Sequence, residues 1–108
     1  MKKMYCYKLT VGLNDQHTKK QEIATDAAEN MIADLLLKKF DIFAFTMIAA
    51  EGVYTHENGE IVREKSIRVE IASDKKIKAM PAIISALKES LNQESIMLEK
   101  GKAKISFD

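Results

Sequence analysis

The dipeptide Asn58-Gly59 stands between two long runs of strand-forming residues, and it limits the possible folds of this chain more than any other feature. Asn-Gly is typical of tight β-hairpin turns, because both residues adopt positive φ angles at low cost. The run before it begins at Ile42, and the run after it extends from Ile61 to Ala72. The sequence therefore predicts a long antiparallel hairpin and argues against an all-helical or purely parallel fold.

The pairing of this hairpin follows from a choice between two registers. A two-residue turn at Asn58-Gly59 places Tyr54 opposite Arg63, but continued along the strands it turns Met47 and its large apolar neighbours to solvent. One extra residue on the first strand, at Glu51-Gly52, turns these side chains toward the core instead and pairs Met47 with Val69. Burying each large side chain is worth about 1.5–3 kcal/mol, and glycine is common at a β-bulge. We therefore expect a bulge at Gly52.

The rest of the chain predicts two further strands and two helices. Apolar and polar residues alternate from Met4 to Leu13, which indicates a half-buried strand. Apolar residues at spacings of three and four indicate a first helix, with capping residues at Thr18 or at Thr25. Residues 96–107 form a terminal strand or a short hairpin.

The second helix is expected to run from a cap at Ser73-Asp74 to Asn92. Pro81 lies within this range, so either it marks the true first turn or the helix is kinked there. The resulting order is β-α-β-β-α-β in a single α+β domain over residues 1–108. This order predicts an antiparallel sheet with two helices on one face and the other face open.

Composition excludes several classes of function. Seventeen Lys and Arg against sixteen Asp and Glu leave a net charge of +1, so nucleic-acid binding is not indicated. The single Cys6 provides no internal disulfide and no second sulfur ligand for zinc. No glycine-rich phosphate loop, signal peptide or membrane-spanning run is present. We expect no cofactor, no metal and no membrane contact, and a cytoplasmic protein.

Residues able to perform catalysis are few. Cys6 is the strongest nucleophile, and His17 and His56 are the only bases that titrate near neutral pH. The predicted fold does not require these three residues to converge. The sequence therefore favours a chain that is not an enzyme. The alternative is a small enzyme with a polar pocket near His56, Glu94 or Tyr7.

Two groups of residues are candidates for binding a partner. The first lies on the hairpin beyond Gly52, where tyrosine and arginine are typical of interface hot spots: Tyr54, His56, Glu57, Arg63 and Glu64. The second lies between the second helix and the last strand: Gln93 and Glu94. The simpler interpretations are a solvated hairpin and a helix C-terminal turn.

The open sheet face is a third candidate surface. Its predicted members are Cys6, Lys8, Thr10, Ala44, Thr46, Ile48, Arg68, Glu70 and Ala72. Semi-apolar faces of this kind are usually covered by a second copy or by a partner. We therefore expect a non-catalytic protein-binding module, as a homodimer or with a protein partner.

Several motifs carry a family resemblance. The Gly52-Val53-Tyr54 step, the G-x-x-x-R-E-x-S hairpin of residues 59–66, the junction Gln93-Glu94-Ser95-Ile96 and the terminal Ser106-Phe107 resemble a bacterial family of small ferredoxin-like domains of unknown function. This resemblance implies a ferredoxin-like fold. Residues 12–22 are similar to small proteins carried on mobile elements of Gram-positive bacteria. That likeness implies an accessory role, such as that of an anti-CRISPR protein, which is encoded by a phage or mobile element and inhibits a defence nuclease of the host.

Overall fold

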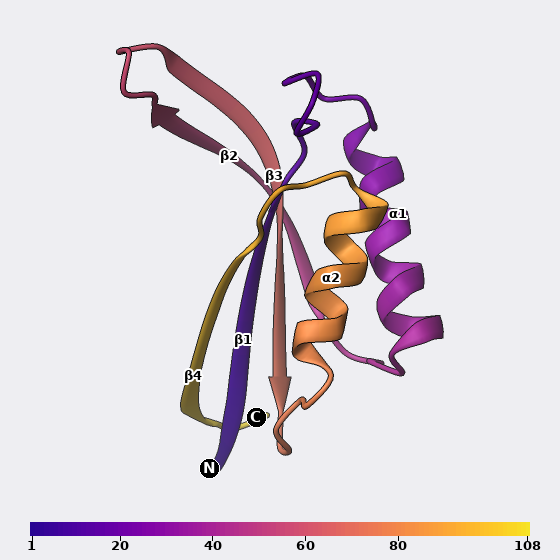
Figure 1. The fold of residues 1–108 in the computed structure, drawn as a ribbon. Helices are drawn as coiled ribbons and strands as arrows, with labels where there is room; N and C mark the ends of the chain where they lie inside the picture. Colours follow the sequence, from indigo (N-terminus) through magenta and orange to yellow (C-terminus); the bar gives the residue numbers. More distant parts are fainter.

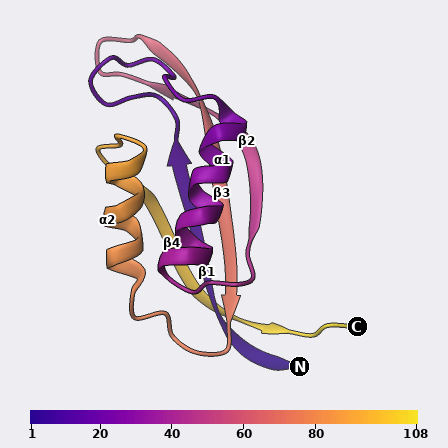
Figure 2. The same ribbon diagram turned by 90° about the vertical axis from the view of Figure 1, so that its right-hand side faces the viewer.

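The computed structural model describes residues 1–108 and contains one four-stranded antiparallel sheet with its helices on one face (Figures 1 and 2). The strands are β1 (Lys2–Gly12), β2 (Thr46–Thr55), β3 (Ile61–Ser73) and β4 (Met97–Ile105), in the spatial order β2-β3-β1-β4. The helices are α1 (Thr25–Asp34), continued by a π-helical turn η1 (Leu35–Lys39), and α2 (Met80–Ser90). The predicted β-α-β-β-α-β ferredoxin-like fold is confirmed.

The core lies between the helices and the two central strands. Alternate residues of β1 and β3 point toward the helices, as the period-two pattern predicts, and Leu9 and Val69 are fully buried. Each helix contributes an apolar stripe, with Ile32 of α1 and Ile83 of α2 also fully buried. Fourteen buried residues form one continuous cluster, so a single core holds sheet and helices together.

The β2–β3 register agrees with the burial argument, but its cause differs from the prediction. Met47 pairs with Val69, as expected. The same register continues without interruption to Thr55 opposite Ile61, so the bulge predicted at Gly52 is wrong. The extra residue lies in the turn instead, which has three residues and closes with Gly59 at a φ of 87°.

This correction changes which residues face each other on the hairpin. Tyr54 pairs with Val62, so the predicted contact between Tyr54 and Arg63 is wrong. Arg63 instead lies 3.6 Å from the carboxylate of Glu51. The Tyr54 ring packs edge-on against the ring of His56, with the ring centroids 5.3 Å apart.

The starts of both helices also differ from expectation. Helix α1 begins after Ala24, so neither Thr18 nor Thr25 is the N-cap residue. Helix α2 begins at Met80 with Pro81 in its first turn, where proline needs no backbone donor. The cap predicted at Ser73-Asp74 is therefore wrong, and the alternative start near Pro81 is confirmed.

The two outer strands depart from the prediction as well. Strand β4 continues without interruption through Gly101 and pairs with β1 along its length, so the short hairpin considered there does not form. Strand β2 begins at Thr46, later than the predicted start at Ile42.

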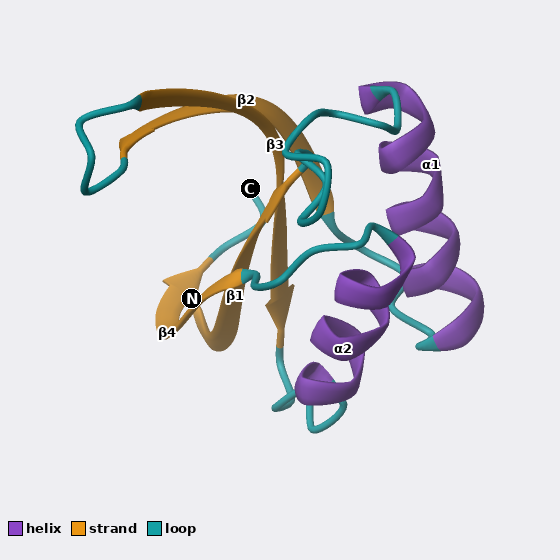
Figure 3. Cartoon of the chain, turned by 45° about the horizontal axis from the view of Figure 1, so that its top comes forward, coloured by secondary structure: helices purple, strands orange, loops and turns teal.

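The β2–β3 hairpin extends beyond the rest of the sheet. Pairing of β1 with β3 ends at Gly12 opposite Ser66, so residues 51–65 have no third strand beside them. We call these residues the arm. Figure 3 shows the arm curving over the side of the sheet that the helices leave free, and Figure 1 shows both chain termini at the opposite end of the molecule. The arm helps to make the molecule long and narrow, with extents of 47 × 29 × 24 Å.

The turn at Gly59 yields the first prediction. Replacing Gly59 by Ala forces a side chain into the left-handed region, which costs about 1–2 kcal/mol, so the free energy of unfolding should fall by that amount in urea denaturation. Gly101→Ala is the control, because a methyl group there meets no atom within 4 Å. Equal stability of the two variants would contradict the assigned turn.

Candidate functional site

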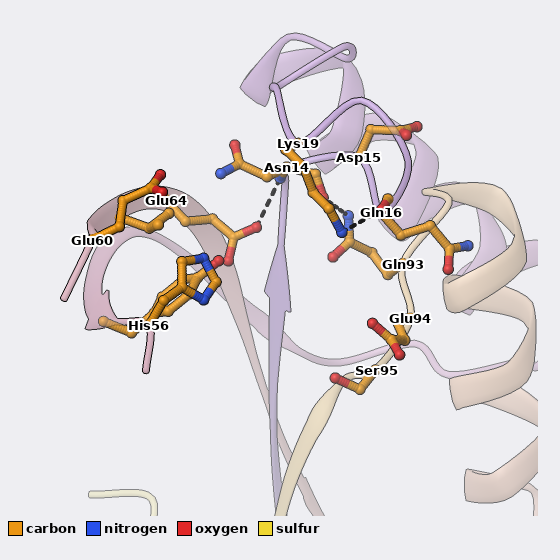
Figure 4. Close-up of a pocket in the computed structure, with 12 residues that line it drawn as sticks. Asn14, Asp15, Gln16, Lys19, His56, Glu60, Glu64, Gln93, Glu94 and Ser95 are labelled. Atoms are coloured by element: carbon orange, nitrogen blue, oxygen red, sulfur yellow. Dashed lines mark hydrogen bonds between the residues drawn. The ribbon is translucent and has the colours of Figure 1, made fainter. Parts of the chain in front are cut away.

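A polar pocket of about 420 Å³ lies at the base of the arm (Figure 4). Three segments that are distant in sequence build it: the loop after β1, the arm, and the junction between α2 and β4. Its lining residues are Asn14, Asp15, Gln16, Lys19, Tyr54, His56, Glu60, Val62, Glu64, Gln93, Glu94 and Ser95. We call it the arm-base pocket.

The two groups predicted separately from the sequence meet in this pocket. Five of the candidate residues line it: Tyr54, His56, Glu64, Gln93 and Glu94. In Figure 4 the arm residues His56 and Glu64 lie on one side of the cleft, and Glu94 lies across from them. Glu57 and Arg63 do not line the pocket.

The strand alternation explains which arm residues point inward. Tyr54 and Val62 are paired across β2 and β3, so their side chains lie on the same face of the arm. Glu64 follows Val62 by two positions and therefore points to that face too. Arg63 points to the opposite face, where it meets Glu51. A shift of one residue would reverse this selection.

Glu64 is the most constrained carboxylate of the pocket. Its Oε2 atom accepts a hydrogen bond of 2.9 Å from the backbone N–H of Asn14. Its carboxylate also lies directly over Gly12, where an added Cβ would come within 2.7 Å of Cδ and both oxygens. The absence of a side chain at Gly12 thus leaves room for this half-buried carboxylate to reach the loop after β1.

Hydrogen bonds fix that loop to the end of α2. The side-chain amide of Asn92 donates to Asp15 Oδ2 at 2.6 Å, and its Oδ1 accepts from the side-chain amide of Gln16 at 2.8 Å. The N–H groups of His17 and Thr18 donate to the other oxygen of Asp15. These hydrogen bonds hold the pKa of Asp15 below its ordinary value of 3.8; the bond from Asn92 has the largest effect, followed by those from the two N–H groups.

Gln93 has a structural part in the same wall. Its side chain is buried, and its amide nitrogen donates to the carbonyl oxygens of Asn14 and Leu91, at 2.7 and 3.3 Å. These bonds join the α2–β4 junction to the loop after β1. Gln93 therefore positions the pocket wall, and its amide nitrogen is already engaged.

The pocket is rich in hydrogen-bond acceptors and in negative charge. Four carboxylates line it, from Asp15, Glu60, Glu64 and Glu94, against a single ammonium group, from Lys19. That ammonium donates to the Gln16 carbonyl at 2.6 Å, so part of its capacity is used within the loop. Such a lining favours a ligand with a positive charge and several donors, and it disfavours phosphate groups.

The other catalytic candidates lie apart. Cys6 pairs with Ala72 and Gly101 in the middle of the sheet and does not line the arm-base pocket, nor does His17. The Tyr7 hydroxyl is buried and accepts a hydrogen bond of 2.9 Å from the backbone N–H of Ile77, ahead of α2. No three His, Cys, Asp or Glu side chains gather at metal-binding distances, and neither α-helix has the length and hydrophobicity to cross a membrane.

Sequence reasoning missed one of the three walls. No binding role was predicted from the sequence for the loop residues Asn14, Asp15, Gln16 and Lys19, nor for Glu60 and Val62, which also line the pocket. The available signal was the polar run Asn14-Asp15-Gln16 directly after an apolar strand. Loops at strand ends are common places for binding residues, so this run could have been added.

The loop network yields a prediction on pH. Because the pKa of Asp15 is lowered on folding, its hydrogen bonds stabilise the folded state above pH 3.8, and this stabilisation is lost as the pH falls through the lowered pKa. Asn92→Ala should raise the pKa of Asp15 toward 3.8 in an NMR titration. Asp74, whose pKa is lowered by its hydrogen bond from Lys2, is the internal control. An unchanged Asp15 would contradict the assigned donor.

Similar solved structures extend over most of the chain. A phage SAM lyase in complex with S-methyl-5'-thioadenosine is 24% identical, with a TM-score of 0.63 over 91% of this chain and 80% of the other. The phage SAM lyase in its apo state is 25% identical, with a TM-score of 0.63 over 93% and 81%. A GlnK–ATP complex from B. subtilis is 14% identical, with a TM-score of 0.54 over 93% and 84%, a likeness of fold alone.

Family membership follows from a different comparison. No curated protein matches the chain significantly. A family model does match, and it covers residues 7–107, so the likeness extends through the N-terminal half as well as the C-terminal half. The predicted relation to a family of unknown function is confirmed: the chain belongs to DUF3574, a family of proteins of unknown function.

Proposed function

We propose that this chain is a small enzyme that binds S-adenosylmethionine, or a close sulfonium analogue, in the arm-base pocket and cleaves its carbon–sulfur bond. The observation that carries this proposal is the convergence of four carboxylates and one tyrosine in a polar pocket, within a fold similar to a phage SAM lyase. The sequence left a binding module, an inhibitor of a host defence nuclease and a small enzyme as alternatives. A polar pocket lined by His56 and Glu94 favours the enzyme.

The ligand chemistry matches the lining. A sulfonium nucleoside with an amino-acid tail carries a sulfonium and an ammonium cation, and its ribose adds hydroxyl donors. Carboxylates accept hydrogen bonds from the ribose hydroxyls and charge-assisted hydrogen bonds from the ammonium, and they attract the sulfonium through its charge. The Tyr54 ring is 46% exposed and lines the pocket, so it offers a flat apolar surface to the adenine base.

The same lining argues against a nucleotide. A triphosphate would bring its negative charges beside Asp15, Glu60, Glu64 and Glu94, with only Lys19 to oppose them. The ATP of the GlnK complex is therefore not the ligand proposed for this chain.

The proposed reaction needs neither water nor a cofactor. The bond between sulfur and the four-carbon amino-acid fragment breaks, and sulfur keeps the electron pair and leaves as neutral S-methyl-5'-thioadenosine. The fragment replaces its lost bond in one of two ways: its own carboxylate closes a lactone, or it loses a proton and forms a double bond. Only the second route needs a base, and Glu94, which is exposed and makes no hydrogen bond within the chain, is the carboxylate available for it.

Binding and turnover test this proposal directly. Calorimetry should detect binding of S-adenosylmethionine and none of ATP, and mass spectrometry should detect S-methyl-5'-thioadenosine formed by the purified chain. Glu64→Gln should raise the Kd for S-adenosylmethionine tenfold or more. A tenfold change corresponds to about 1.4 kcal/mol, which is close to the contribution expected of one charge-assisted hydrogen bond. Glu57→Gln is the matched control, because this arm carboxylate lies outside the pocket.

Further variants test whether the Glu64 carboxylate binds the ligand and which of the two routes the fragment follows. Gly12→Ala should mimic Glu64→Gln, because the new methyl group displaces the Glu64 carboxylate, whereas Gly52→Ala, with only an ordinary contact, should not. Activity retained in Glu94→Gln indicates closure of the lactone. Absence of binding would overturn the proposal. Binding without formation of S-methyl-5'-thioadenosine would contradict the enzymatic function and favour a non-catalytic binding module.

A second candidate is inhibition of a host defence nuclease by a protein encoded on a phage or mobile element. The observation that favours it is that two of the similar structures are phage proteins. Expression in a host with an active nuclease system should raise the plating efficiency of a targeted phage at least tenfold. The Glu64→Gln variant separates the two ideas, since inhibition that survives this change does not depend on the pocket.

A further inference from the structure

The sheet face opposite the helices carries a second, apolar groove of about 670 Å³. Four aromatic residues line it, and two of them, Phe43 ahead of β2 and Phe107 in the C-terminal tail, are 75% and 86% exposed. Small residues lie between them, including Cys6, Ala44 and Ala72. No segment of this chain covers these aromatic rings, so this open face is unpartnered in the single chain.

The total surface of the chain is too large for a protein of its size. Its accessible area is 7367 Å², whereas about 6,100 Å² is typical of a folded monomer of 12.2 kDa. The excess of about 1,300 Å² exceeds the roughly 800 Å² that each partner buries in a standard interface. The chain therefore exposes more surface than a typical monomer of its size, by an amount larger than one partner's share of a standard interface.

The charges on the open face suit contact between identical surfaces. Lys8 is paired in register between Glu70 of β3 and Glu99 of β4, and its ammonium lies 3.9 Å from Glu99. Arg68 lies in the next row, opposite Thr10. The two cations and two carboxylates of these two rows balance each other, so two copies do not repel each other there, and a rotated copy can set Lys8 against a carboxylate.

We propose that the open face is an interface between copies of this chain, centred on Phe43 and Phe107. The inference does not depend on the proposed enzymatic function, because it rests on exposed aromatic side chains, excess surface and charge balance. Each copy offers the same patch, so the contact is self-complementary. A different protein as the occupant is an outcome of the test below.

Light scattering after size-exclusion chromatography, at micromolar concentration and without ligand, tests the proposal. The wild-type chain should have at least twice the mass of 12.2 kDa. The double variant Phe43→Lys and Phe107→Lys should have the mass of one chain, and its fold should be retained because both side chains are exposed. Met31→Lys, at an exposed apolar position of α1 on the helix side, is the control and should remain associated.

The thiol of Cys6 reports on the same face. Assembly should protect it, so its reaction with a maleimide should be several-fold faster in the double variant than in the wild type or in Met31→Lys. A wild-type chain of single mass would overturn the proposal and leave a different protein as the occupant of the face. An assembly that persists in the double variant, with Cys6 equally reactive, would place the interface elsewhere.

Discussion

The three-residue turn that closes at Gly59 sets the pairing register of the β2–β3 hairpin, both where it packs in the core and along the arm. Its register places Met47 against Val69 in the core, and the same register places Tyr54 beside Val62 on the face of the arm that lines the pocket. Side chains alternate with a period of two, so a shift of one residue would reverse both assignments together. A single glycine with positive φ thus links the packing of the core to the composition of the site.

The sequence predicted the core register but not the position of the extra residue, and the reason is physical. Burial of Met47 requires one residue more than a two-residue turn provides between the paired strands. A bulge at Gly52 and a turn longer by one residue both meet this requirement. Only the residues beyond Gly52 distinguish the two cases, and those are exposed and carry little packing energy. The predicted pairing was consequently wrong in the arm, where Tyr54 does not face Arg63, whereas the alternating pattern of the central strands was predicted correctly.

The site was predicted in pieces. Tyr54, His56 and Glu64 were selected on the hairpin, and Gln93 and Glu94 at the junction, but nothing in the spacing indicated that they share one cavity. Their meeting depends on the curvature of the arm and on hydrogen bonds between residues far apart in the chain. The bond from Asn92 to Asp15 spans 77 positions, and no local pattern encodes such a contact. The helix caps were also predicted incorrectly: α1 begins after Ala24, and α2 begins at Met80 with Pro81 in its first turn.

The net charge is only +1, but the charged side chains are unevenly distributed over the surface. Carboxylates concentrate in the arm-base pocket, whereas Lys100, Lys102 and Lys104 lie along the exposed edge strand β4, where lysine discourages pairing with other sheets. Strands β1 and β3 carry both the open face and the Gly12–Glu64 contact. A second copy on the open face would restrain the strands that position Glu64, and by linkage a ligand bound to Glu64 would favour the assembly to the same degree.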